Sequence, residues 1–153
     1  MIKALVIVSV IISTILIAFI LKAIYFMRIK VFYDFKYLIN IFIQEVAFKK
    51  TSFMSCYNSN VLKLSNYSSR VISDYLYSKK KRFLCNRNDF IEMYDFIDNV
   101  AMGDVDYTIA TSKYYLSNVE LKLDAIEKEY KTNGILYFKL IIILGIGVAI
   151  LIL

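Results

Sequence analysis

The sequence predicts an all-α fold, a membrane-anchored helical bundle with one transmembrane helix at each end. Of the 153 residues, 59% are hydrophobic, a larger share than soluble domains usually have. Aliphatic residues gather at the two ends, and between them apolar residues recur at the spacing of amphipathic helices. We therefore expect an N-terminal anchor over residues 1–24, a cytoplasmic helical-bundle domain over 25–132 and a C-terminal anchor over 133–153.

The first anchor is an apolar run over residues 4–21, interrupted by small hydroxyl residues and bracketed by Lys3 and Lys22. As a helix it would span roughly 27 Å, about the thickness of a hydrocarbon core. A cleaved signal peptide is the competing interpretation. The run is longer than the core of a usual signal peptide, and no small-residue cleavage site precedes a polar start. We predict an uncleaved anchor.

The helix of the first anchor is expected to continue to about residue 49, and Thr51 or Ser52 can cap a short helix after it. Further helices are predicted over about 67–77 and from Asn88 onward. The residues expected to form the core are Val31, Phe35, Leu38, Phe42, Val46 or Glu45, Val61, Leu62, Leu64, Val71, Ile72, Tyr75, Leu76, Phe90, Ile91, Tyr94, Ile97 and Val100.

The last third of the chain predicts one long helix that begins after Gly103, with Asp104 as its cap. Apolar and aromatic residues recur in it at the seven-residue interval of a packing seam. One line of the seam is Ile109, Leu116, Leu123 and Tyr130, and the other is Val105, Val119 and Ile126, broken by Ser112. We expect this helix seam to pack on the helix that leaves the first anchor.

The second anchor follows where the amphipathic pattern stops, after Gly134. Residues 135–153 are apolar on every face except at Lys139, whose ammonium would reach the headgroups. Gly145 and Gly147 lie in the middle of this run, where small residues permit close helix approach. Their spacing places them on different faces of the helix.

A net charge of +6 is typical of proteins that bind nucleic acid and of chains with a segment retained on the cytoplasmic side of a membrane. In this chain basic residues flank both anchors on the inner side, and beyond the anchors there is only Lys3, which argues weakly for the opposite orientation. The inner flanking residues are Lys22, Arg28, Lys30, Lys36, Lys122, Lys128, Lys131 and Lys139. We therefore expect the middle of the chain in the cytoplasm of the cell, both termini on the far side of the cell membrane, and no nucleic-acid partner.

Candidate chemistry is sparse, and we expect neither an enzyme nor a cofactor. The chain has no histidine, which excludes catalysis by imidazole, and two cysteines cannot form a metal site by themselves. We expect Cys56 and Cys85 to be buried free thiols. The aspartates near residue 103 could bind a cation, but Asp104 and Asp106 suit a helix cap and first turn, and the calcium-loop spacing is absent.

The most concentrated charge in the chain is the run Lys79, Lys80, Lys81 and Arg82, which we call the basic run. As a functional feature it would contact an acidic protein surface or anionic lipid headgroups. The ordinary alternative is a solvated loop between two helices. We name these four residues as the candidate partner-binding site.

Three passages together resemble the stage III sporulation protein AB family of endospore-forming bacteria. They are the start at residues 1–3 with the apolar run after it, residues 44–53, and residues 102–106. The residues that match the family in the last two passages are Glu45, Thr51, Gly103 and Asp106. Ser52 stands where the family usually has proline, and Ala110 where it commonly has glutamine.

The resemblance implies a cytoplasmic helical domain similar to the platform protein of type II secretion and type IV pilus machines. It also implies a place in the mother-cell membrane around the forespore, in the channel complex that forespore development needs. The expected partners are the cytoplasmic ATPase and the membrane subunits of that complex, with a homo-oligomer also open. The role would be structural. The alternatives are a platform-like component of a secretion or pilus system outside sporulation, and a small membrane-perturbing hairpin protein.

Overall fold

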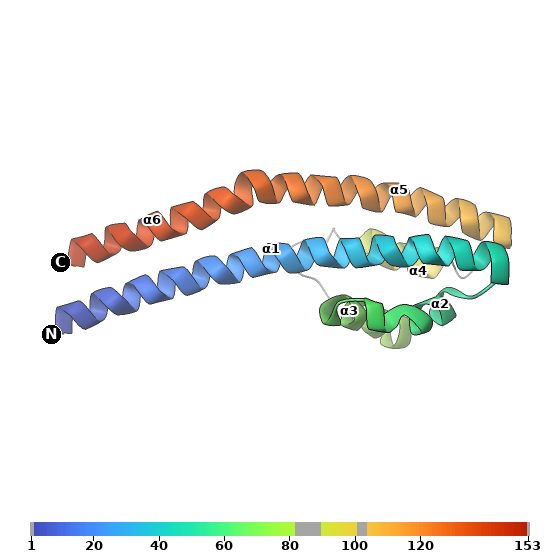
Figure 1. The fold of residues 1–153 in the computed structure, drawn as a ribbon, viewed down its shortest axis with the longest axis horizontal. Coiled ribbons are helices and arrows are strands. Elements are labelled where there is room, and N and C mark those ends of the chain that lie inside the picture. Colours follow the sequence, from blue (N-terminus) through green and yellow to red (C-terminus); the bar gives the residue numbers. More distant parts are fainter. Residues whose placement is uncertain (1, 82–89, 101–103, 153) are drawn as a thin grey trace. The chain divides into compact units, whose positions relative to one another are not determined.

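The computed structural model describes residues 2–81, 90–100 and 104–152, and every regular element in those ranges is helical (Figure 1). The helices are α1 (Ile2–Lys49), α2 (Phe53–Asn60), α3 (Asn66–Ser78), α4 (Ile91–Asn99), α5 (Val105–Glu129) and α6 (Ile135–Ile152). A 3₁₀ turn, η1 (Val61–Lys63), follows α2, and a π-helical turn, η3 (Tyr130–Gly134), joins α5 to α6. The predicted all-α fold class is therefore confirmed.

The chain divides into two compact units. Unit 1 comprises Met1–Phe26 and Ile126–Leu153, and unit 2 comprises Met27–Ala125. Unit 1 thus contains the apolar ends of the chain, and unit 2 contains the segment between them.

Unit 1 is an antiparallel pair formed by the first part of α1 and by α6. The ring of Tyr25 lies 5.7 Å from that of Tyr130, and the ring of Phe19 lies 6.2 Å from that of Phe138. Further toward the N-terminus, Thr14 lies against Gly145. Residue numbers fall along α1 as they rise along α6, so the two helices run in opposite directions.

Gly145 sets how closely these two helices approach. A methyl group built at Gly145 would lie 2.7 Å from Cβ of Thr14, closer than carbon atoms can approach without displacement. One at Gly147 would meet nothing within 4 Å. The prediction that the two glycines lie on different faces is consistent with this geometry, and Gly145 is the one at the contact.

Two helical stretches, Lys3–Lys49 and Val105–Ile152, have the length and the apolar composition that a membrane crossing needs. Helices in the cores of soluble proteins and signal sequences can have the same length and composition. In a soluble core, however, the apolar stretch is buried, whereas 6% of the most apolar stretch is buried in the first helix and 11% in the second. Their side chains are exposed on most faces, which matches lipid-facing helices.

The π-helical turn lies where the sequence changes from amphipathic to apolar. The backbone N–H of Ile135 donates to the carbonyl of Tyr130, five residues back. The Thr132 hydroxyl donates to the carbonyl of Lys128 at 2.8 Å. The side chain of Thr132 thus bonds to the backbone one turn earlier, where the α-helix passes into the π-helical turn.

Unit 2 is built around the second half of α1, whose buried face contacts the other helices. In Figure 1 this part of α1 runs beside α5, and an ion pair of 2.9 Å joins Lys36 to Glu120. The predicted core residues that are buried are Val31, Phe35, Leu38, Phe42, Val46, Leu64, Val71, Ile72, Tyr75, Phe90, Tyr94, Ile97 and Val100.

Phe96 of α4 is the aromatic centre of this core. Its ring lies 5.5 Å from that of Phe35 and 5.3 Å from that of Phe53, both edge to face. The rings of Phe42 and Tyr115 lie 6.4 and 5.4 Å away. Through this one side chain, α4 contacts α1, α2 and α5.

A buried carboxylate ties α3 to α1. Asp34 of α1 accepts hydrogen bonds from the backbone N–H of Ser65 at 2.9 Å and from the hydroxyl of Ser68 at 2.7 Å. Lys30, one turn earlier, pairs with the other oxygen of Asp34 at 3.2 Å. Ser65 is also the N-cap of α3, so Asp34 holds the start of that helix in place.

Some of the predictions for the core and the helix starts differ from the structure or fall outside the described ranges. Leu62, a predicted core residue, is 97% exposed, because it lies in the 3₁₀ turn η1, which has no buried residue. Leu64, directly after this turn, is buried. Ile91 is exposed, because it is the first residue of α4. Val61 and Leu76 are half-buried, and Asn88, the predicted start of a helix, lies outside the described residues.

Candidate partner-binding surface

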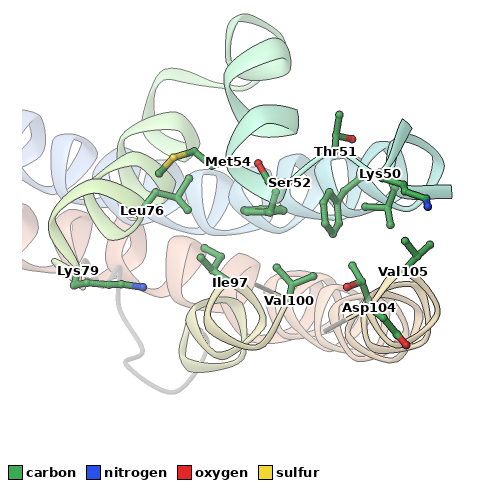
Figure 2. Close-up of a pocket in the computed structure, with 14 residues that line it drawn as sticks. Lys50, Thr51, Ser52, Met54, Leu76, Lys79, Ile97, Val100, Asp104 and Val105 are labelled. Atoms are coloured by element: carbon green, nitrogen blue, oxygen red, sulfur yellow. The ribbon is translucent and has the colours of Figure 1, made fainter. Parts of the chain in front are cut away.

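Unit 2 contains a cavity of about 450 Å³ (Figure 2). Residues from α1, α2, α3, α4 and α5 contribute to it. They are Phe42, Val46, Lys50, Thr51, Ser52, Phe53, Met54, Leu76, Lys79, Ile97, Val100, Asp104, Val105 and Thr108. We call this cavity with its rim the docking hollow.

Four helix ends meet at the docking hollow. Lys50 directly follows α1 and Lys79 directly follows α3, and both lysines have a φ of 51°, in the left-handed region. Glycine is the usual residue at such a position, because a side chain is strained there. Helices α2 and α5 start at the hollow, where Ser52 accepts from the N–H of Ser55 at 3.3 Å and Asp104 accepts from the N–H of Tyr107 at 2.8 Å. Helix ends leave fewer side chains to fill the space between them.

The hollow has an apolar floor and a polar rim. In Figure 2, Leu76 and Met54 face Ile97 and Val100 across it. Lys79 stands at one end in this view and Lys50 at the other. An apolar pocket with charged groups at its edge is the arrangement that takes up an anchor side chain from a partner protein.

Lys79 is the one residue shared by the docking hollow and the basic run. Its ammonium pairs with Asp98 of α4 at 2.5 Å and lies 4.7 Å from the centre of the Tyr75 ring. The Tyr75 hydroxyl donates to the same carboxylate. The positive charge of Lys79 is therefore already matched inside the chain, and the exposed pair adds little stability.

The contacts among Lys79, Tyr75 and Asp98 shift the pKa values of the tyrosine and the aspartate. Burial, together with the hydrogen bond and negative charge of Asp98, raises the pKa of Tyr75 to about 12. For Asp98, burial alone would raise the pKa. The hydrogen bonds from Lys79 and Tyr75 and the nearby ammonium groups outweigh that, so the pKa of Asp98 lies below its ordinary value. At neutral pH the tyrosine is neutral and the aspartate charged.

Two further members of the basic run, Lys80 and Lys81, lie among the described residues. The ammonium of Lys81 lies 5.8 Å from the centre of the Tyr94 ring and 6.0 Å from that of Tyr75. Lys80 is exposed, with its backbone N–H donating to the carbonyl of Asp74. Arg82 lies outside the described residues. Of the basic run, the structure thus places Lys79 at the apolar cavity and Lys81 against the two tyrosine rings.

The residues matched to the sporulation family lie at two places. The hydroxyl of Thr51 donates to Glu45 at 3.4 Å, so these two residues interact across the end of α1. Asp106 lies in the first turn of α5, where a negative charge suits the helix dipole. Gly103 lies outside the described residues.

The helix seam is buried unevenly. Val119, Leu123 and Ile126 are buried, and the half-buried members are Val105, Ile109, Leu116 and Tyr130. Ser112, which interrupts the predicted pattern, is fully buried, and its hydroxyl has no hydrogen-bond partner among the described residues. A small side chain at that point lets α5 pack closely.

Metal and thiol chemistry find little support in the described part of the chain. No group of three or more aspartate, glutamate or cysteine side chains there could hold a metal ion. Cys56 is a free, buried thiol. Burial and the neighbouring Glu45 raise the pKa of Cys56 to about 12, which keeps the thiol protonated and unreactive. Cys85 lies outside the described residues.

Three features of the site are beyond what the sequence pattern predicts. The docking hollow is lined by residues from five helices, and the periodicity of one helix does not report how it meets the others. Lys50 has a left-handed backbone without the glycine that would signal it. The pairing of Lys79 with Asp98 spans 19 positions, and only the aromatic residues on both helices hint at contact between α3 and α4.

Comparisons with protein-family models, with curated protein sequences and with solved structures find no match to this chain.

Proposed function

We propose that this chain is a non-enzymatic membrane scaffold that is anchored by the two apolar helices of unit 1. Its unit 2 binds a partner protein through the docking hollow and the basic run. The exposed apolar faces of the two helices in unit 1 support the membrane part of this proposal. In water such faces would aggregate, whereas in a bilayer they are solvated by lipid.

The proposed orientation has unit 2 in the cytoplasm. Its support is the distribution of basic residues, which are frequent after the first apolar run and before the second, whereas Lys3 is the only one beyond them. Basic flanks are retained on the cytoplasmic side during insertion.

We further propose that the scaffold serves a sporulation channel complex in the mother-cell membrane around the forespore, with the cytoplasmic ATPase and the membrane subunits of that complex as partners. The support is the resemblance to the stage III sporulation protein AB family, in particular the order of the two anchors and of the matched residues Glu45, Thr51 and Asp106. The aromatic core of unit 2 also favours a scaffold over a membrane-perturbing hairpin, in which the middle of the chain would be only a spacer.

The observation that carries the proposal is the docking hollow, which has Lys79 in its lining and the rest of the basic run directly after that residue in the chain. An apolar floor selects a partner with a projecting apolar side chain, and the exposed Lys80 and Lys81, which follow Lys79 in the chain, select one that also carries acidic residues. Both features are found together on protein surfaces, and neither implies a catalysed reaction.

The test reverses two charges of the basic run that take no part in the ion pair between Lys79 and Asp98. The double variant Lys80→Glu, Lys81→Glu leaves Lys79 bound to Asp98. We expect its affinity for the ATPase encoded by a neighbouring gene to fall about tenfold, since like charges then face each other, with a parallel fall in sporulation efficiency. Binding is measured with the full-length chain in detergent.

The matched control is Lys113→Glu, which reverses an exposed charge on α5 away from the hollow. It should bind as the unaltered chain does. If the double variant and the control bound the ATPase equally well, the assignment of the partner surface to the basic run would be wrong.

A further inference from the structure

Unit 1 contains a second cavity, of about 310 Å³, at the end of both apolar runs. Six residues line it: Lys22 of α1, Tyr130 and Gly134 of the π-helical turn, and Ile135, Phe138 and Lys139 of α6. We propose that this cavity binds the phosphate headgroup of an anionic phospholipid between the ammonium groups of Lys22 and Lys139.

The π-helical turn is what opens the space. It adds one residue to a helical turn between Tyr130 and Gly134. The Tyr130 ring folds over Gly134, where a methyl group would lie 2.7 Å from ring carbon Cδ2, so a larger residue there would displace the ring. On its other side the ring packs against Tyr25 and Phe26, with centroids 5.7 and 5.6 Å away. The cavity is thus held open by rigid aromatic packing.

The position of the cavity matches the depth of lipid headgroups. Lys22 directly follows the apolar run of α1, and Lys139 lies near the start of the apolar α6. Lysines at the ends of spanning helices extend toward the headgroups, and aromatic residues gather at the same level. Basic pockets between spanning helices on the cytoplasmic side are places where anionic headgroups bind.

The charges at the cavity call for an anion. Both lysines are exposed, and no carboxylate among the described residues forms an ion pair with either. The ammonium of Lys22 lies over the Phe138 ring, 5.9 Å from its centre, so an aromatic face holds it at the cavity. A phosphate diester in the cavity would be attracted by both positive charges.

The size of the cavity and its apolar lining favour a lipid over free phosphate. The volume is far larger than the roughly 30 Å³ that one water molecule occupies in the liquid, and Ile135 and Phe138 line it beside the lysines. These side chains continue into the exposed apolar surface of α6, along which acyl chains can lie. Inorganic phosphate would gain nothing from that surface.

The experiment measures lipid binding to the full-length chain in neutral detergent by native mass spectrometry. Phosphatidylglycerol and phosphatidylcholine with identical acyl chains are titrated in parallel, with the variants Lys22→Gln, Lys139→Gln and the double variant. We expect phosphatidylglycerol to bind more tightly, and its affinity to fall about fivefold for each lysine removed, with phosphatidylcholine binding unchanged. The control Lys131→Gln removes an exposed charge in the same turn that does not line the cavity, and should leave binding unchanged.

Three outcomes would overturn the inference. They are equal binding of the two lipids, an equal effect of Lys131→Gln and the double variant, and displacement of the lipid by excess inorganic phosphate, which would identify a free phosphate ligand. The inference rests on the proposed membrane insertion, which is tested separately by alkaline extraction of cell membranes. A chain that remained in the membrane but did not select phosphatidylglycerol would refute the lipid site alone.

Discussion

At the scale of single residues, small side chains determine how the helices of unit 1 approach each other. Thr14 and Ala18 lie one turn apart on α1, and Gly145 and Ala149 lie one turn apart on α6. Ala18, Gly145 and Ala149 are buried, in a unit where most large apolar side chains are exposed. Small residues four apart let helix backbones approach within a membrane, where van der Waals packing drives association.

Gly145→Val should therefore weaken the helix pair of unit 1. The new side chain would collide with Thr14, whose Cβ lies 2.7 Å from the position of the first added carbon. We expect a loss of about 1–3 kcal/mol, the usual cost of overpacking. The measurement is the resistance of the detergent-solubilised chain to unfolding by dodecyl sulfate.

Gly147→Val is the matched control, because it makes the same chemical change two residues away where nothing lies within 4 Å. It should unfold as the unaltered chain does. Equal destabilisation by both variants would mean that helix propensity, and not the contact with Thr14, sets the effect.

At the scale of elements, the attachment of α3 to α1 depends on one buried carboxylate. Burial by itself would raise the pKa of Asp34, but hydrogen bonds from Ser65 and Ser68 and the nearby Lys30 outweigh it. The pKa of Asp34 therefore lies below its ordinary value of 3.8. A lowered pKa means that the folded state favours the charged form, and this adds stability above the pKa of the unfolded chain.

The stability that Asp34 contributes should be lost as the pH falls below about 4 and through the lowered pKa of the folded state. Asp34→Asn, which cannot carry the charge, should cost about 1–3 kcal/mol at neutral pH and flatten the dependence of stability on pH in that acid range. Denaturant unfolding of the solubilised chain, followed by tyrosine circular dichroism at several pH values, measures both effects. Asp124→Asn, at an exposed position of α5, serves as control. An Asp34→Asn chain as stable as the control would refute the anchoring role.

Periodicity predicts the elements well, and it fails where a helix changes type. The stripe from Val31 to Val46 and the long α1 are predictable, because each apolar residue there repeats at helical spacing. Leu62 is misplaced by the pattern because a 3₁₀ turn rotates successive side chains by a larger angle than an α-helix. The π turn at Tyr130 escapes prediction, since its sequence differs little from an ordinary helix end.

The candidate site is predictable only in part, for a different reason. The basic run is local in the sequence, so it can be found there, whereas the docking hollow beside it joins residues from five helices. The spacing of small residues within one helix is equally insufficient to predict a contact. Gly145 and Ala149 lie on one face of α6, but the sequence does not show that Thr14 of α1 lies against Gly145. Contacts between distant segments leave no periodic signal in either segment.

At the scale of the whole molecule, the division into two units separates two kinds of stabilisation. Unit 1 has small buried residues and exposed apolar faces, which is packing suited to lipid. Unit 2 has a core of interlocking aromatic rings, which the hydrophobic effect stabilises in water. Unit 2 should therefore fold without the apolar ends of the chain.

A fragment of residues 27–125 is expected to be soluble and to unfold in one cooperative transition. Within it, Phe96→Ala should cost about 3–5 kcal/mol, because the Phe96 ring is fully buried and contacts rings of α1, α2 and α5. The matched control is Phe48→Ala, which removes the same side chain from a position that is 87% exposed and should change stability little. Urea unfolding of the three fragments gives the comparison. A fragment without a cooperative transition would mean that unit 2 needs its membrane ends to fold, and equal effects of the two substitutions would mean that Phe96 is not the centre of its core.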